Sequence, residues 1–246
     1  MNKNTISILS LPFEPLTAHA AEARLRTLLR TPKTSLVFTP NTVMLFRAER
    51  DHAIARMLAS ADLLLPDGMG VVAASRFLGT PLPERLSGID MAQKLLAHAE
   101  KQGLRVFLLG GKPGIAKKAA ERLKQRFPDL RICGTHHGYF GHHREEEESV
   151  VQLIRAASPH ILFACLGFPK QEEWLLRHRT CFPTLRLGMG LGGSLDVWSG
   201  EIERAPERMQ SIGLEWLWRA LREPRRFSVL LTVPALAAAL LKQKKG

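Results

Sequence analysis

Short apolar runs alternate with longer amphipathic stretches through residue 200, and this alternation restricts the fold more than any other feature of the chain. The longer stretches place apolar residues at helical spacing, as in Ile89–Gln102. Strands that alternate with helices form a largely parallel sheet with helices on both faces, so the sequence predicts an α/β protein. The predicted strands are Ser35–Phe38, Asp62–Leu65, Arg105–Leu109, Leu130–Cys133, Ile161–Leu166 and Leu185–Met189. The predicted helices are Thr42–Ala59, one opening near Gly68, Ile89–Gln102, Ile115–Phe127, Glu145–Ala157 and Lys170–Arg179.

The alternation stops near Gly200. From there the chain predicts two consecutive helices, Pro206–Leu221 and Arg225–Lys245, with Pro224 between them. We therefore expect an α/β core over residues 1–200 and a helical appendage over residues 201–246. The length of 246 residues suits one large domain or two small ones.

Positive charge gathers in the appendage. The formal net charge of the chain is +12, and half of this excess lies in residues 219–246. Such a cluster indicates an anionic partner: nucleic acid, a phospholipid surface or a phosphorylated ligand. The run Phe227–Leu241 is shorter than the roughly 20 residues that a membrane-spanning helix needs, and it is too apolar for a solvated arm. The appendage is therefore predicted to lie on a membrane rather than to bind nucleic acid, although its Trp residues also suit a helix packed on the core.

Neither the cysteines nor the histidines form a recognisable metal site. Cys133, Cys165 and Cys181 contain no CxxC pair and suit a reducing compartment. The tract His136–His143 has four histidines, yet no Cys or carboxylate stands at ligand spacing around it, which favours a solvated loop. No segment resembles a signal peptide.

Glycines and short polar residues follow five of the predicted strands. In open parallel sheets, ligands bind at the carboxyl ends of the strands, and helix N-termini there suit phosphate. These loops predict a nucleotide-type pocket, although each glycine could instead serve only a tight turn. The expected nucleotide-binding residues are Gly110, Gly111, Gly167, Gly190 and Gly193.

Three side chains near these strand ends are candidates for chemistry. Asp67 could act as a general base or merely cap the following helix. Arg85 could hold a phosphate through two hydrogen bonds or form a surface ion pair. Gln171 could donate to a sugar or diphosphate, or simply occupy the first turn of its helix.

A set of motifs in a fixed order resembles the WecG/TagA/CpsF glycosyltransferase family. The resemblance covers roughly residues 35–228. The matching motifs are Thr39-Pro40-Asn41, Asp67-Gly68-Met69-Gly70, Arg85 with Gly88-Ile89-Asp90, Gly110-Gly111, Gly138-Tyr139-Phe140, Gly167–Glu172, Gly188–Gly200, Arg204-Ala205-Pro206 and Leu214–Arg226.

The resemblance implies a Rossmann-like enzyme on the cytoplasmic face of the membrane. Such an enzyme transfers a sugar, typically N-acetylmannosamine or its uronic acid, from a UDP donor to a polyprenyl-diphosphate-linked sugar, with inversion. It also implies that Asp67 is the base and that Thr39, Asn41, Arg85 and Gln171 line the pocket. The appendage arginines would be Arg219, Arg225 and Arg226. No DxD metal-binding motif is present, and we expect neither a metal nor a cofactor.

Two rival functions belong to other classes. A nicotinamide-dependent oxidoreductase would share the fold, but the chain lacks GxGxxG with a downstream ribose-binding acid. A non-enzymatic adaptor that binds anionic membrane would explain the tail but not the polar strand ends. The sequence identifies neither the sugar nor the oligomeric state, because an apolar tail is hidden in a self-association interface as readily as in lipid.

Overall fold

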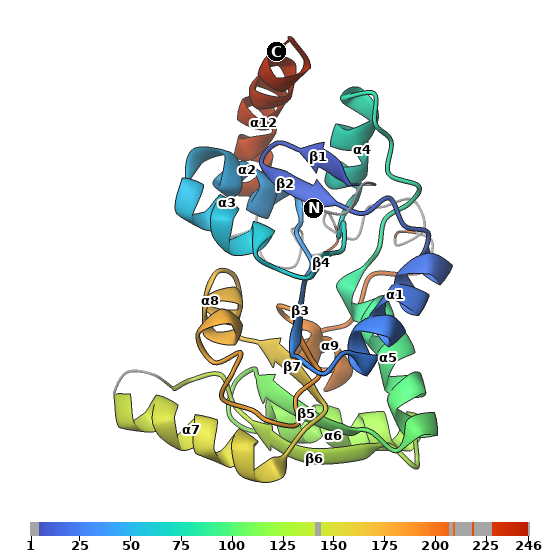
Figure 1. Cartoon of the computed structure of the whole chain (residues 1–246), viewed down its shortest axis with the longest axis vertical. Helices are drawn as coiled ribbons and strands as arrows, with labels where there is room; N and C mark the ends of the chain where they lie inside the picture. The colour runs from blue at the N-terminus through green and yellow to red at the C-terminus, as the bar shows by residue number, and fades with distance from the viewer. Residues whose placement is uncertain (1–4, 141–143, 207–208, 210–217, 219–227, 246) are drawn as a thin grey trace. The chain divides into compact units, whose positions relative to one another are not determined.

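The chain folds into two compact units in the computed structural model, which describes residues 5–140, 144–206, 209, 218 and 228–245 (Figure 1). The first unit contains Met1–Ala18, Thr39–Ser87 and Glu203–Gly246. The second contains His19–Phe38 and Gly88–Ile202. The described residues from Glu203 onward fall in the same unit as the segment that carries Asp67.

Five strands of the parallel sheet belong to the second unit. They are β3 (Ser35–Phe38), β5 (Arg105–Gly110), β6 (Arg131–His136), β7 (Ile161–Cys165) and β8 (Leu187–Gly190), in the order β3-β8-β7-β5-β6. All four pairings between them are parallel. The residues of β3, β7 and β8 are buried throughout, whereas those of the edge strand β6 are partly exposed. The predicted α/β class with a parallel sheet is confirmed.

Helices flank these strands on both faces. The second unit contains α1 (Ala18–Arg30, whose first residue falls in the first unit), α5 (Gly88–Gln102), α6 (Ile115–Arg126), α7 (Arg144–Ala157), α8 (Lys170–Arg177) and α9 (Ser194–Trp198). The chain moves outward from β5 to β6 through α6, and back toward β8 through α7 and α8. Right-handed crossovers therefore place α6 on one face and α7 and α8 on the other.

The first unit combines a β-hairpin with helices. It contains β1 (Ile6–Ile8) and β2 (Leu11–Phe13), which pair antiparallel, then α2 (Thr42–Arg50), α3 (His52–Ala59), β4 (Leu63–Leu64), α4 (Met69–Phe77) and α12 (Ser228–Lys245). The single helix predicted over Thr42–Ala59 is wrong. Asp51 is extended, and its side chain accepts hydrogen bonds from the backbone N–H groups of Ala53 and Ile54. This cap ends α2 and begins α3.

The last helix packs within the first unit, beside α2. Leu236 and Leu240 are buried, and the Gln243 side chain bonds to the backbone of Leu9 and Ser7 in the hairpin. The predicted helix over Arg225–Lys245 is thus confirmed from Ser228 onward. The helix predicted over Pro206–Leu221 falls largely outside the described residues. Among the helices in the described ranges, none is long and apolar enough to cross a membrane.

Candidate active site

Backbone hydrogen bonds bring three segments of the first unit together around Asp67. The Asp67 N–H donates to the carbonyl of Pro40 at 3.0 Å, and the Leu86 N–H donates to the carbonyl of Pro66 at 2.9 Å. The segments that begin at Thr39, Pro66 and Arg85 therefore converge, although they are far apart in the sequence. Four predicted site residues, Thr39, Asn41, Asp67 and Arg85, belong to this cluster.

Asp67 directly precedes the N-cap of α4. That N-cap is Gly68, with φ +117°. The Asp67 side chain is 31% exposed, and its Oδ1 lies 3.5 Å from Nε of Arg85, which is 16% exposed. A solvent-accessible carboxylate is thus held beside a guanidinium group.

Thr39 and Asn41 belong to the same short segment of the chain, but their exposure to solvent differs. Asn41 is exposed and forms the N-cap of α2, where its Oδ1 accepts from the N–H groups of Val43 at 3.0 Å and Met44 at 3.2 Å. Thr39 is buried. Asn41 therefore has a structural task that sequence analysis did not assign to it.

Three neighbouring strands of the second unit end in glycine loops. In the sheet register, Gly110 of β5 lies opposite Cys165 of β7, and Ala164 of β7 lies opposite Gly190 of β8. Gly110 has φ +135°, and a Cβ added there would collide with the carbonyl group of Cys165. The Gly111 N–H donates to the same carbonyl at 3.3 Å. The strand ends therefore approach so closely that only glycine fits at position 110.

Gln171 is almost fully buried, at 3% exposure, in the first turn of α8. Its Oε1 accepts from the Gly192 N–H at 2.9 Å, and its Nε2 donates to Oε1 of Glu172 at 2.8 Å. A Cβ on Gly190 would lie 2.9 Å from that Nε2. The structure thus places Gln171 against the loop that contains Gly190 and Gly193, with its amide already occupied by protein groups.

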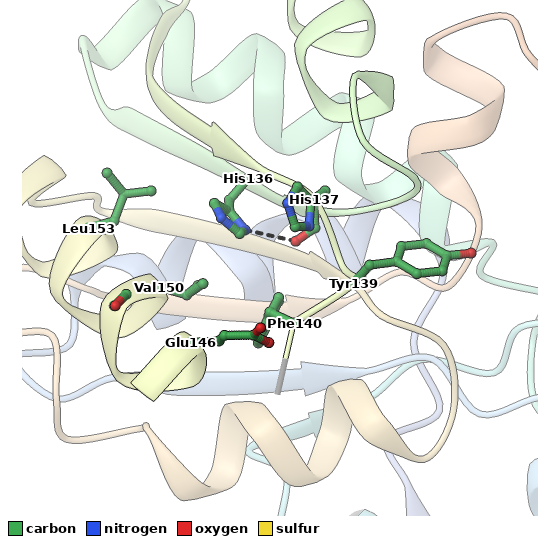
Figure 2. Close-up of a pocket in the computed structure, with 8 residues that line it drawn as sticks. His136, His137, Tyr139, Phe140, Glu146, Val150 and Leu153 are labelled. Atoms are coloured by element: carbon green, nitrogen blue, oxygen red, sulfur yellow. Dashed lines mark hydrogen bonds between the residues drawn. The ribbon is translucent and has the colours of Figure 1, made fainter. Parts of the chain in front are cut away.

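A pocket of about 510 Å³ opens where β6 meets α7 (Figure 2). Its lining comprises His136, His137, Tyr139, Phe140, Glu146, Ser149, Val150 and Leu153. Figure 2 shows the Tyr139 ring extending away from the other labelled side chains, and Tyr139 is 60% exposed. Burial, together with the charge of His136, lowers the pKa of His137. The described residues contain no group of three or more His, Cys, Asp or Glu that could hold a metal ion.

Two further side chains near the strand ends were not identified as site residues from the sequence. Lys170 begins α8, and its Nζ donates to the carbonyls of Gly138 at 3.2 Å and Phe140 at 3.0 Å. Glu172 is fully buried, and this desolvation raises the pKa of its carboxyl to about 7. Both residues stand in the Gly167–Glu172 motif, so their position was visible in the sequence, but their contacts were not.

Gly167 has φ +78°, and its carbonyl accepts from the Gln171 N–H at 2.9 Å. Arg219, Arg225 and Arg226 lie outside the described residues. Burial raises the pKa of the Cys165 thiol to about 12, which agrees with the expectation that this cysteine is a small core residue.

Comparison with known proteins relates nearly the whole chain to one family. The model of the "Glycosyl transferase WecG/TagA/CpsF family" matches residues 6–246. Three similar relatives share the name "N-acetylglucosaminyldiphosphoundecaprenol N-acetyl-beta-D-mannosaminyltransferase".

Identity to these relatives extends over most of each protein. The Bacillus spizizenii protein is 36% identical over 89% of this chain and 84% of its own length. The Bacillus subtilis protein is 35% identical over 86% of this chain and 81% of its own length. The Staphylococcus aureus (strain MW2) protein is 32% identical over 99% of this chain and 95% of its own length.

Proposed function

This chain belongs to the WecG/TagA/CpsF glycosyltransferase family. From that premise we propose that it transfers N-acetylmannosamine from UDP-N-acetylmannosamine to GlcNAc-diphosphoundecaprenol, with inversion of the anomeric centre. The names of the relatives indicate the acceptor and the sugar. The observation that supports the chemistry best is the Asp67–Arg85 pair, in which an accessible carboxylate lies beside a guanidinium group. Family membership decides against both rivals, the nicotinamide-dependent oxidoreductase and the non-enzymatic adaptor.

In the proposed reaction, the Asp67 carboxylate removes the proton from the attacking hydroxyl of the acceptor sugar. That oxygen forms a bond to the anomeric carbon of the donor sugar, on the face opposite UDP. The bond from this carbon to the diphosphate oxygen breaks, and UDP leaves with both electrons. A positioned general base contributes about 10²–10⁴-fold to such a step. Attack from the opposite face inverts the anomeric centre.

The leaving UDP develops negative charge that the protein must stabilise. Arg85 is suited to this task because its guanidinium group is mostly buried, and a poorly solvated cation interacts more strongly with phosphate. We assign the nucleotide to the glycine loops after β5, β7 and β8, where the N-termini of α6 and α8 offer N–H groups. The collision that a side chain at Gly110 would cause supports a role for exposed backbone at this edge.

We also propose that the C-terminal segment attaches the enzyme to the cytoplasmic face of the membrane, where its lipid-linked acceptor lies. Lys242 and Lys244 are exposed on α12, and Leu241, which precedes Lys242, is 49% exposed. Exposed cations beside an exposed apolar side chain suit an anionic lipid surface. Arg219, Arg225 and Arg226 are proposed to bind the acceptor diphosphate.

A UDP-release assay tests the proposed function. The purified chain is incubated with a panel of UDP-sugars and an alkyl-diphosphate-linked GlcNAc acceptor. We expect acceptor-dependent release of UDP with UDP-N-acetylmannosamine and an Asp67→Asn variant that is slower by about 10²–10⁴-fold. The variant should still bind UDP, because the carboxylate is not assigned to the nucleotide. Near-normal turnover by Asp67→Asn would overturn the role of this residue, and no release with any donor would overturn the proposed function.

A further inference from the structure

We propose that Glu172 is a positioning residue for sugar transfer: its buried carboxyl group fixes the amide of Gln171, and this amide holds the Gly190–Gly193 loop in the conformation that binds the donor nucleotide. The inference rests on the proposed function, which assigns the nucleotide to this loop. All the residues involved belong to the second unit. They form a chain of contacts from α8 to the end of β8.

The orientation of the Gln171 amide follows from its backbone partner. A backbone N–H can only donate, so the atom that faces Gly192 at 2.9 Å must be the amide oxygen. The Nε2 group then points to Oε1 of Glu172 at 2.8 Å. Without that acceptor, a buried NH₂ group would lose its partner, and rotation of the amide would no longer be prevented.

The Gln171 amide can contact the Gly190–Gly193 loop because Gly190 has no side chain. A side chain at Gly190 would come within 2.9 Å of Gln171 Nε2, so the absence of a Cβ lets the amide reach the loop. Gly192 has φ +55°, a backbone conformation that residues other than glycine rarely adopt. The Leu191 N–H donates to the carbonyl of Ala164 at 2.9 Å, which ties the same loop to the end of β7.

Burying the carboxyl group of Glu172 is unfavourable for the fold, and its hydrogen bond with Gln171 offsets part of this cost. Glu172 is fully buried, and within the described part of the chain its Oε2 has no hydrogen-bond partner. Burying a polar group without a partner is unfavourable, so an apolar side chain of similar size would be better tolerated there. Desolvation raises the pKa of this carboxyl to about 7, which agrees with an uncharged acid that serves as an acceptor for Gln171. The benefit of Glu172 therefore lies in the bond to the amide.

Three variants separate positioning from packing. Glu172→Met keeps most of the volume, removes the unpartnered oxygen and cannot accept from Gln171. Glu172→Gln keeps an acceptor oxygen, so it is the conservative rescue. Glu173→Gln is the matched control, because Glu173 is the exposed neighbour on the same helix turn. Hydrogen exchange of peptides covering residues 187–195 reports on the loop, calorimetry reports on UDP affinity, and UDP release gives kcat and the donor KM.

We expect Glu172→Met to fold, to speed exchange in the loop and to weaken UDP binding and raise the donor KM by roughly five- to tenfold, the value of one lost hydrogen bond. Its kcat should change by less than about threefold, because the loop binds rather than reacts. Glu172→Gln and Glu173→Gln should stay within about twofold of wild type. Unchanged exchange and UDP affinity in Glu172→Met would overturn the inference, as would equal losses in the Gln and Met variants.

The two proposals fail in different ways. If the wild-type chain released no UDP, the proposed function would fall, while exchange in the 187–195 peptides would still report whether Glu172 holds the loop. If the wild-type chain transferred sugar normally and Glu172→Met matched it in donor KM, only the positioning role would be lost.

Discussion

The two units present their candidate site residues in opposite ways. In the first unit, Asp67 and Arg85 are charged side chains with partial access to solvent. In the second unit, the strand ends present backbone at glycines, and Gln171 behind them is buried with both ends of its amide bonded. A group that exchanges a proton must reach the substrate, whereas a surface that binds phosphate benefits from being rigid before the ligand arrives.

This contrast predicts different consequences of mutation in the two units. Changes to the charged pair should slow the reaction and leave the fold and nucleotide affinity largely intact. Changes to the glycines or to their buried support should alter stability and nucleotide affinity first. The experiments below test this division.

The largest effect on stability is expected at Gly110. A Gly110→Ala variant combines a left-handed φ with a collision against the Cys165 carbonyl, so its free energy of unfolding should fall by about 2–5 kcal/mol. Gly114→Ala is the matched control, because Gly114 has φ +88° with no atom within 4 Å of an added Cβ. It should lose only about 1–2 kcal/mol. Chemical denaturation measures both, and equal losses would show that the close approach of β5 and β7 is unimportant.

In the first unit, Arg85→Gln should lower kcat by about 10²–10³-fold, the usual effect of removing one group that stabilises developing charge. UDP affinity should fall much less, and the melting temperature should stay close to that of wild type. Arg76→Gln, which changes an exposed arginine of the same unit, serves as the control. A similar loss of activity in both variants would mean that general positive charge, rather than the position beside Asp67, is responsible.

The buried carboxyl of Glu172 predicts a pH dependence of stability. In the folded chain, desolvation raises its pKa from 4.5 to about 7, despite the opposing bond from Gln171, and the nearby Glu173 adds to the rise. Between these two pH values the unfolded state binds fewer protons than the folded state, so stability falls as pH rises.

Glu172→Gln removes this titration. Its stability relative to wild type should therefore increase by about 3 kcal/mol between pH 4 and pH 8. Denaturant unfolding at several pH values measures the difference, and Glu173→Gln should show almost none of it. A constant difference between Glu172→Gln and wild type across this range would contradict the raised pKa.

The smallest effect is expected at Asn41, where a structural task and a proposed binding task coincide. Asn41→Ala should cost about 1 kcal/mol through loss of the α2 cap, and Asn41→Ser should restore most of this because serine also caps helices. If the amide also binds substrate, both variants should lose about fivefold in kcat/KM. Full activity in Asn41→Ser would leave Asn41 with the capping role alone.

Sequence periodicity located most elements because burial on both faces leaves a continuous apolar run. The strands around Val106, Phe163 and Leu36 were found in this way. The helix α1 and the hairpin of β1 and β2 were not predicted, and the break at Asp51 was missed because an aspartate also occurs on the solvent face of a helix. A cap is a local competition between hydrogen bonds, and it leaves little trace in the apolar pattern.

Some details of the candidate site could not be obtained from the sequence. The motif around Lys170 and Gln171 pointed to a loop at a strand end, and the structure placed it there. The motif did not indicate that the Gln171 side chain would be buried against Gly190, because that contact depends on the order of the strands in the sheet. The pairing of Asp67 with Arg85 likewise depends on a backbone hydrogen bond that joins Leu86 to Pro66 across the segment containing α4.

The sequence by itself determined the α/β class, the glycines at the strand ends and the family, because periodicity and local motifs are properties of short segments. Only the tertiary structure decided that Asp67 lies beside Arg85 and that the buried Glu172 carboxyl accepts a hydrogen bond from Gln171. Those facts join residues through contacts across turns and between elements. Such contacts follow from strand order and burial, which no short segment encodes.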